Sequence, residues 1–372
     1  MKQTGNDSVA HGLPRHYYLS EEIYQQELER VFKRQWLVAG HISLARNPGD
    51  YFVKQVGPES MIIAHDKSGT MRAYFNVCRH RGYQILGDEE QGSRSIFVCP
   101  YHQWSYSNDG CLKAVPGAEN GRAFAFEDYS LHEAHCEVWY GWICVYLGED
   151  NPIPLADVAA PLSDEAKLKA IGSERLKLAH RETYIMDANW KSVFENGAEC
   201  YHCAKGHPSL VVSCEYEAFY GGNVFEDPDR ANFPLREGMA TFSMDGKRVV
   251  KKALGTRQED GFNTGFIFMP IFSGPILFVD HAVSLEVTPL ARDRTQMISE
   301  WYVHEDAEEG ADYDVQTLVE VFHNTNKEDS AFAERNYKGI RSARFTPGPL
   351  HPVREKMIID NHKVYLEMMA AE

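Results

Sequence analysis

Two short stretches decide the fold of this chain: NVCRHRGYQ at residues 76–84 and CPYHQW at residues 99–104. Each stretch places one cysteine close to one histidine, namely Cys78 and His80 in the first and Cys99 and His102 in the second. Two loops that each carry such a pair can converge on a single cluster of ligands. Thiolates and imidazoles are the side chains that soft and borderline metal ions prefer. The pattern therefore predicts a metal centre held by these four side chains.

Two kinds of centre fit two cysteines and two histidines. They can hold a zinc ion, or a [2Fe–2S] centre in which the two histidines bind one of the irons. Zinc fingers usually offer two cysteines first and the histidines later in the chain. Here each loop offers one cysteine and one histidine. This mixed order favours the iron–sulfur centre.

Short strand-like runs surround both pairs. Alternating and β-branched residues are separated by turn residues such as Gly57-Pro58 and Lys67-Ser68-Gly69. The runs are YFVKQV, SMIIAHD, MRAYFNV, SIFV and VWYGWICVYLG. We expect residues 41–150 to form a small all-β domain that carries the metal centre on two of its loops.

The rest of the chain mixes helical and strand patterns. Ser20 followed by two glutamates predicts the start of an N-terminal helix that ends near Trp36. After a linker at residues 149–154, strand patterns occupy residues 262–290 and 295–305. Helical patterns occupy 163–172, 187–205, 314–340 and 354–370. The expected fold class is α+β, with an antiparallel sheet and helices in the second domain.

Composition excludes several classes of protein. The net charge of −16 argues against nucleic-acid binding, because phosphate backbones require a basic surface. No apolar run is long enough for a membrane span, and the N-terminal segment has no apolar signal core. We therefore expect a cytoplasmic protein with no nucleic-acid or membrane partner. In that compartment its eight cysteines are not expected to form a disulfide framework.

A second candidate metal site lies in ANWKSVFENGAECYHCAKGHP, residues 188–208. His202 and His207 are five residues apart, and Glu199 precedes His202 by three, which places it on the same helical face. Gly206 can end the helix so that the second imidazole turns back. Two histidines near a helix end can also be ordinary surface residues. Cys200 and Cys203 offer a rival Cys-x2-Cys metal pair, although no second pair lies nearby.

The run CRHRG followed by CPYHQW resembles the Rieske domain of the Rieske non-haem iron oxygenases. The resemblance implies that Cys78 and Cys99 hold one iron of a [2Fe–2S] cluster, and that His80 and His102 hold the other. Replacing thiolates by neutral imidazoles raises the reduction potential of such a cluster.

The second run resembles the catalytic motif of the same oxygenases, an acidic residue followed by two histidines. The family completes its mononuclear iron site with a carboxylate far downstream. The matching position is Asp329 in NTNKEDSAFAERNYKGI, and Glu328 is the neighbouring alternative. The resemblance thus implies an Fe(II) bound by His202, His207 and Asp329, with positions left open for O₂ and substrate.

The resemblance also implies architecture and partners. Residues 1–40 would pack on a helix-grip catalytic domain of residues 156–372, and residues 41–150 would be the Rieske domain. Head-to-tail homotrimers would bring the cluster of one subunit to the iron of the next. There Glu199, a catalytic residue, would bridge His102 of one chain and His202 of another. Electrons would come from a separate NAD(P)H-dependent reductase of flavin and ferredoxin type.

Two departures from the ring-hydroxylating branch indicate the substrate class. Glu199 stands where that branch typically has Asp, and Gln103 stands where Gly is more usual. With LPRHYY and VHEDAEEGADYDV, they resemble the branch that acts on quaternary ammonium compounds. The implied function is a monooxygenase that N-demethylates a betaine such as glycine betaine or proline betaine, with release of formaldehyde. The alternatives are an aromatic-ring-hydroxylating dioxygenase α subunit and, in another class, a Rieske electron-transfer protein without oxygenase activity.

Aromatic faces can bind a trimethylammonium group, which carries charge but no N–H donor. His281 could face the substrate pocket or pack in the core. The candidate rings are Phe262, Phe266, Phe268, Phe272, Phe278 and Tyr302.

Overall fold

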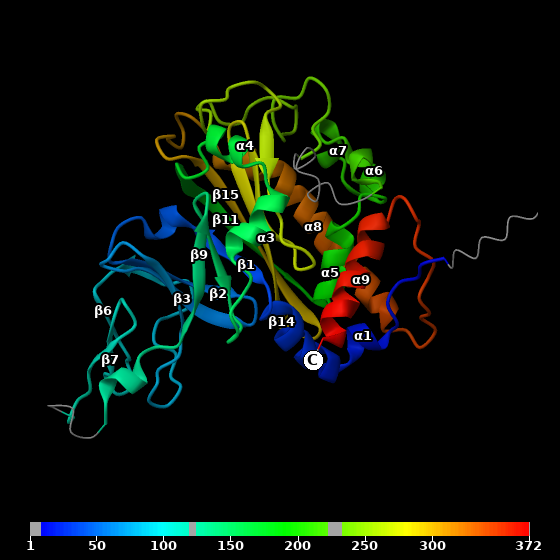
Figure 1. The fold of residues 1–372 in the computed structure, drawn as a ribbon. Coiled ribbons are helices and arrows are strands. Elements are labelled where there is room, and N and C mark those ends of the chain that lie inside the picture. Colours follow the sequence, from blue (N-terminus) through cyan, green and yellow to red (C-terminus); the bar gives the residue numbers. More distant parts are fainter. Residues whose placement is uncertain (1–8, 119–123, 222–232, 372) are drawn as a thin grey trace, which may run out of the picture.

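The structure is a computed structural model that describes residues 9–118, 124–221 and 233–371. Figure 1 shows an all-β part at one end of the molecule and a larger part, in which helices lie against a second sheet, at the other. The predicted α+β class, with a small all-β domain before an antiparallel sheet with helices, is confirmed. Among the helices of the described part, none has the length and apolar character needed to cross a membrane.

The all-β part contains two sheets. The larger has the strand order β1-β10-β9-β4-β3-β2-β5, and the smaller has the order β6-β7-β8. The first sheet begins at Trp36, where the chain leaves the N-terminal helical segment. The bounds are β1 Trp36–His41, β2 Asp50–Val56, β3 Glu59–His65, β4 Met71–Phe75, β5 Gln91–Ser93, β6 Ile96–Val98, β7 Ser105–Ser107, β8 Leu112–Ala114, β9 Glu133–Trp139 and β10 Trp142–Tyr146, with 3-10 turns η2 Ile42–Ala45 and η3 Phe126–Tyr129.

The larger part is built on a five-stranded antiparallel sheet with the order β11-β15-β14-β13-β12. Its strands are β11 Leu176–Met186, β12 Asn263–Gly265, β13 Ser273–Phe278, β14 Ala282–Ala291 and β15 Arg294–His304. The long helix α8, Val315–Ile340, packs against β11 and against α5, Trp190–Gly197 (Figure 1). The Asp314 side chain caps α8 by accepting a hydrogen bond from the Thr317 N–H at 2.9 Å.

The remaining helices are short, except for the last. They are α1 His16–Leu19, α2 Glu21–Glu27, η1 Leu28–Phe32, α3 Leu155–Ala159, η4 Ala160–Leu162, α4 Glu165–Ala170, α6 Cys203–Gly206, α7 Leu210–Ser213, η5 Tyr216–Phe219 and α9 Lys356–Ala370. The helix expected over residues 187–205 is therefore wrong in its second half. It ends at Gly197, and an irregular segment leads into the single turn of α6.

The N-terminal segment is anchored on the larger part through a buried carboxylate. Glu27 is fully buried and accepts hydrogen bonds from the Trp190 indole at 2.8 Å and the Tyr365 hydroxyl at 2.5 Å. Lys191 supplies the opposite charge, with its Nζ 2.5 Å from a Glu27 oxygen. Phe32 packs edge-on against Trp190 in a core that also takes in strands of the all-β part. The three regions of the chain therefore share one continuous core.

A second buried charge cluster joins the seven-stranded sheet of the all-β part to the five-stranded sheet of the larger part. Lys54 on β2 lies 2.7 Å from Glu286 on β14 and 3.2 Å from Glu300 on β15, and Arg181 also pairs with Glu300 at 2.7 Å. Burial raises the pKa of Glu286 to about 7, although Lys54 opposes this. Burial also acts to raise the pKa of Glu300, but Lys54 and Arg181 outweigh it and hold that pKa at about 2. Lys54 is therefore the main counter-charge for Glu286.

Replacing this lysine by methionine, K54M, should destabilise the protein by about 3–5 kcal/mol, because it leaves buried carboxylates without their cation. The loss of stability in K54M should also depend on pH. Since the folded-state pKa of Glu286 is raised to about 7, its contribution to stability is present at acid pH and is lost as the pH rises through that value. Without Lys54 this pKa rises further. The difference in thermal midpoint between wild type and K54M should therefore be larger at pH 8 than at pH 6.

The matched control is K33M, because Lys33 pairs with the exposed Glu29 and is itself 28% exposed. Surface pairs of this kind contribute little, so K33M should leave the midpoint nearly unchanged at both pH values. Equal shifts for the two variants, or a K54M deficit that grows toward acid pH, would contradict the role given to Lys54.

Candidate functional site

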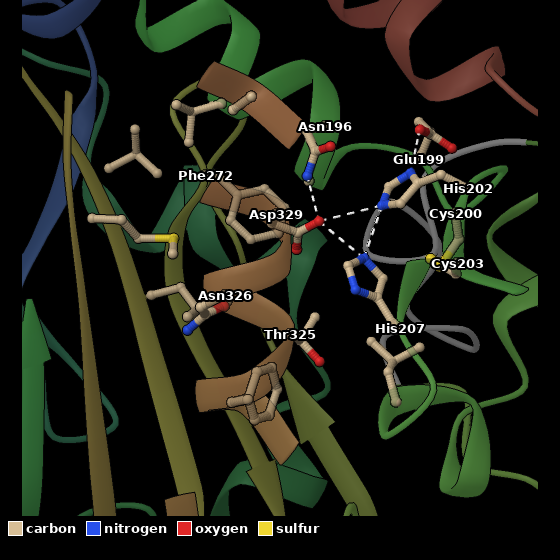
Figure 2. Close-up of a pocket in the computed structure, with 18 of the residues that line it drawn as sticks. Asn196, Glu199, Cys200, His202, Cys203, His207, Phe272, Thr325, Asn326 and Asp329 are labelled. Carbon is tan, nitrogen blue, oxygen red and sulfur yellow. Dashed lines mark hydrogen bonds and ion pairs between the residues drawn. A yellow bond between two sulfur atoms is a disulfide. The ribbon is translucent and has the colours of Figure 1, made fainter. Parts of the chain in front are cut away.

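Three donor atoms from distant parts of the chain meet at one point. The Nε2 atoms of His202 and His207 lie 2.9 Å apart. Asp329 Oδ1, from the middle of α8, lies 3.3 Å from the first and 2.9 Å from the second (Figure 2). His202 and His207 flank the single turn α6 at its two ends. Two imidazoles and one carboxylate facing a common centre are the ligand set typical of non-haem Fe(II), so the residues present fit a mononuclear iron.

Gly206 contributes to this geometry through its lack of a side chain. A Cβ at this position would lie 3.0 Å from the Phe332 ring and 3.2 Å from His202 Cδ2. Any larger residue would push the first imidazole or Phe332 out of place. The reason for the glycine is therefore close packing beside His202.

The outer nitrogen of each histidine is held by a carboxylate. His202 Nδ1 donates to Glu199 Oε1 at 2.5 Å, and His207 Nδ1 donates to Glu328 Oε2 at 2.8 Å. Asn196 Nδ2 donates to Asp329 Oδ1 at 2.5 Å. Such partners fix the tautomer, so that each Nε2 presents its lone pair to the centre. Glu328, the alternative ligand, thus contacts the outer side of His207, whereas Asp329 faces the shared point.

The carboxylates make the site strongly favourable to positive charge. Burial acts to lower the pKa of His202, but hydrogen bonds to Asp329 and Glu199 raise it to about 9. The pKa of His207 is raised in the same way by Asp329 and Glu328, against the effect of burial. Burial acts to raise the pKa of Asp329, but the two histidines outweigh it, and the pKa is lowered. A bound divalent cation would satisfy the same charges.

The two cysteines beside this site are joined to each other. Cys200 and Cys203 form a disulfide, with their Cα atoms 4.9 Å apart. The alternative of a Cys-x2-Cys metal pair is therefore wrong, and the expectation that the cysteines stay unpaired is corrected for these two. The other six cysteines are free. The disulfide closes a short loop that contains Tyr201 and His202.

A small pocket of about 110 Å³ opens beside the three donor atoms. Its walls are mostly apolar and come from β11, β13, β14, β15, α5, α8 and the segment around α6 and α7. The charged side chains among its described lining residues are Glu199 and Asp329, together with the two histidines, and there is no lysine or arginine among them. The phenylalanines of the wall are Phe219, Phe233, Phe272 and Phe322. The pocket therefore suits an apolar or cationic molecule.

One of the six predicted rings, Phe272, lines this pocket. Its backbone has φ = 59°, a left-handed conformation that is rare for a bulky residue. Four of the others lie in packed cores, and Phe262 is half-buried and packs against one of them. His281 is buried and donates from Nδ1 to Asp280 at 2.9 Å, so it packs instead of facing the pocket. Phe322 was not predicted, although it lies two helical turns before Asp329 on one face of α8.

The first candidate centre lies on loops of the all-β part, beside the small sheet β6-β7-β8. Cys78 and Cys99 are buried free thiols, and the rings of His80 and His102 are 4.6 Å apart. Burial raises the pKa of Cys99, and the neighbouring Cys78 adds to the effect. The Trp104 ring stacks on His80 at 4.9 Å. Two buried thiols and two more accessible imidazoles are a donor set that would hold a [2Fe–2S] cluster.

Gln103 in the second loop has φ = 61°. This left-handed conformation costs a residue with a Cβ about 1–2 kcal/mol, and glycine avoids that cost. The loop geometry therefore gives a physical reason for the glycine that is more usual at this position in the proteins that the motif resembles. In this chain Gln103 adopts the same left-handed conformation although it has a Cβ.

Comparison with known proteins agrees with both centres. Residues 35–132 match the family of the Rieske [2Fe-2S] domain, and residues 173–371 match the family of the ring hydroxylating alpha subunit, catalytic domain. A glycine betaine monooxygenase oxygenase subunit from Pseudomonas aeruginosa is 31% identical over 385 residues, covering 96% of this chain and 89% of that protein. A carnitine monooxygenase oxygenase subunit from Escherichia coli is 29% identical over 241 residues, covering 63% of this chain and 64% of that protein.

Solved structures show the same fold. The quaternary ammonium Rieske monooxygenase CntA in complex with L-carnitine aligns with a TM-score of 0.77 at 23% identity, over 98% of this chain and 97% of that chain. Naphthalene 1,2-dioxygenase from Rhodococcus sp. aligns with a TM-score of 0.70 at 21% identity, over 97% and 94% of the two chains.

The chain belongs to the Rieske non-haem iron oxygenases, because both domain families match and a relative of this kind aligns along nearly its whole length. Within that class it belongs to the quaternary ammonium monooxygenase family. The two domains imply a Rieske [2Fe–2S] cluster and a mononuclear iron. The resemblance deduced from the motifs is thus confirmed, and the match to residues 173–371 shows a catalytic domain of this family beside the Rieske domain.

Proposed function

We propose that this protein is the oxygenase component of a monooxygenase that removes an N-methyl group from a betaine such as glycine betaine or proline betaine. The observation that carries the proposal is a His-His-carboxylate donor set that opens into a small, mostly apolar pocket edged by acidic residues and phenylalanine rings. Curated relatives named for glycine betaine and carnitine support the same substrate class.

The proposal assigns a ligand role to seven residues. His202, His207 and Asp329 hold the mononuclear iron, while Glu199, Glu328 and Asn196 hold those ligands in place. The [2Fe–2S] cluster is bound by Cys78, His80, Cys99 and His102. When bound, the mononuclear iron supplies activation of O₂ and the cluster supplies electrons, which is chemistry that amino acid side chains do not provide.

The pocket residues bind and orient the substrate. A quaternary nitrogen has no N–H, so aromatic faces such as that of Phe272 attract it, each by about 0.5–2 kcal/mol. The apolar walls exclude water from the reacting C–H bond. In the overall reaction one oxygen atom of O₂ is inserted into a C–H bond of an N-methyl group to give N–CH₂OH, and the other leaves as water after taking up two electrons and two protons. The N–C bond then breaks, nitrogen keeps the electron pair, and formaldehyde and a proton are released.

The assembly proposed for this chemistry contains more than one copy of the chain. Within one chain the loops around β6 and β7 lie at the opposite end of the molecule from α6 (Figure 1). A head-to-tail homotrimer would place the cluster of one copy beside Glu199 of the next. Glu199 would then link His202 of its own chain to His102 of the neighbour. The two electrons would come from NAD(P)H through a separate reductase of flavin and ferredoxin type.

The test is an activity assay of the purified protein with a ferredoxin-type reductase, NADH, O₂ and a panel of betaines. We expect formaldehyde in about equal amount to the O₂ consumed for at least one betaine, and a red-brown protein with about three irons per chain. The same apolar pocket could also accept a flat arene, so naphthalene and indole belong in the panel. Formation of a dihydrodiol without formaldehyde from any betaine would replace the proposal by a ring-hydroxylating dioxygenase.

A further inference from the structure

Among the described residues of the pocket wall, one buried polar side chain has no hydrogen-bond partner. Thr325 on α8 is 5% exposed, and its hydroxyl has no hydrogen-bond partner among the described residues. The other polar groups at this wall are paired: Asn196 binds Asp329, and Asn326 donates to Ser299 at 2.9 Å. A threonine within a helix commonly bonds to the carbonyl four residues earlier, but Thr325 does not. A buried hydroxyl left unpaired is costly, which points to a partner that the protein itself lacks.

The position of Thr325 in the pocket is informative. It lies one helical turn before Asp329, and Figure 2 shows both side chains on the pocket side of α8. Four residues of α-helix rise by about 6 Å. Thr325 is therefore placed to meet a different part of the substrate from the part that lies next to Asp329.

We propose that Thr325 is a specificity-determining residue that donates a hydrogen bond to an oxygen atom of the substrate, such as a carboxylate oxygen of a betaine. This inference rests on the proposed function and extends it. The quaternary nitrogen has no N–H to offer the hydroxyl, and the described lining contains no lysine or arginine for the carboxylate. Among the described lining residues, the Thr325 O–H is thus the buried donor that has no other partner and can reach that oxygen.

The dimensions of a small betaine match this arrangement. In glycine betaine four bonds of about 1.2–1.5 Å separate an N-methyl carbon from a carboxylate oxygen, which gives about 5 Å in an extended form. With its oxygen at Thr325, the molecule would place an N-methyl group at the Asp329 end of the pocket. The same contact would therefore select both the kind of substrate and the carbon that is oxidised.

The experiment compares T325V, which removes the hydroxyl and keeps the shape, with T325S, which keeps the hydroxyl. The probes are glycine betaine and tetramethylammonium, which share the cationic head but differ in the carboxylate. Dissociation constants are measured by calorimetry on the iron-loaded protein without reductase, so that no turnover occurs. T264V is the matched control, because Thr264 is likewise a buried threonine whose hydroxyl has no partner among the described residues, but it lies outside this pocket.

T325V should weaken binding of glycine betaine about 10- to 100-fold, because a hydrogen bond to a charged group is lost. It should leave tetramethylammonium binding unchanged, and the thermal midpoint of the ligand-free protein should not fall. T325S and T264V should bind glycine betaine like the wild type. Unchanged binding of glycine betaine by T325V, or equal weakening of both probes, would overturn the inference while leaving the proposed function intact. A wild-type protein that binds neither probe would overturn the inference, whereas the proposed function is decided separately by formaldehyde release across the panel of betaines.

Discussion

The D329A variant is expected to lose about one iron per chain and to have no measurable turnover, while it keeps its visible iron–sulfur spectrum. Asp329 Oδ1 lies within 3.3 Å of the Nε2 atoms of both histidines, so it is the negative charge nearest the point where they meet. Its removal leaves two imidazoles and no anionic ligand. The measurement is iron by elemental analysis, with the absorbance of the cluster as an internal reference for the irons that remain.

The matched control is E328A, which removes the adjacent carboxylate on the same helix. Glu328 accepts from His207 Nδ1 at 2.8 Å and therefore orients that ligand from outside. Loss of such a partner typically lowers metal affinity about 10- to 100-fold, so E328A should regain full iron occupancy when iron is supplied in excess. If E328A stays one iron short in excess iron while D329A retains its iron, the ligand is Glu328.

The two site motifs illustrate what the sequence could predict. Cys78, His80, Cys99 and His102 are close in the chain, and their spacing alone indicated one centre on two loops. His202 and His207 were likewise local. Asp329, by contrast, is separated from His202 by 127 residues, and no periodicity indicates such a contact. Its assignment depended on resemblance to a family, and only the folded chain shows which atoms it faces.

Other features could not be predicted because tertiary packing decides them. The predicted helix over 187–205 ends at Gly197, where the chain must leave the helix to bring Glu199 and His202 to the site. Of the aromatic candidates, Phe272 reaches the pocket, whereas Phe266 and Phe268 point into a separate core. Strand patterns alone did not indicate which of these rings the pocket would include. The disulfide beside the site also contradicted an argument based only on the cellular compartment.

The second large effect is expected for E199Q, which should keep both metal centres and lose at least about 100-fold in turnover. Glutamine retains one oxygen to accept from His202 Nδ1, so the imidazole stays oriented. What disappears is the negative charge. Iron content and the visible spectrum show whether both metal centres are retained, and formaldehyde release from the same preparation shows the loss of turnover. The matched control is E328Q, the same substitution on the carboxylate that holds His207.

The difference between the two variants tests the role proposed for Glu199 between subunits. If charge on any carboxylate behind a histidine were sufficient, E328Q would lose as much activity as E199Q, and no bridge would be needed.

A stricter test uses mixed oligomers of E199Q with C78S, a variant that lacks a cluster ligand. Neither chain should be active alone. Because the E199Q copy has an intact cluster and the C78S copy has an intact Glu199, a head-to-tail assembly places one beside the other, and co-expressed chains should regain part of the activity. Mixed oligomers with no activity above either parent would mean that each cluster serves its own chain, and the bridge between copies would be wrong.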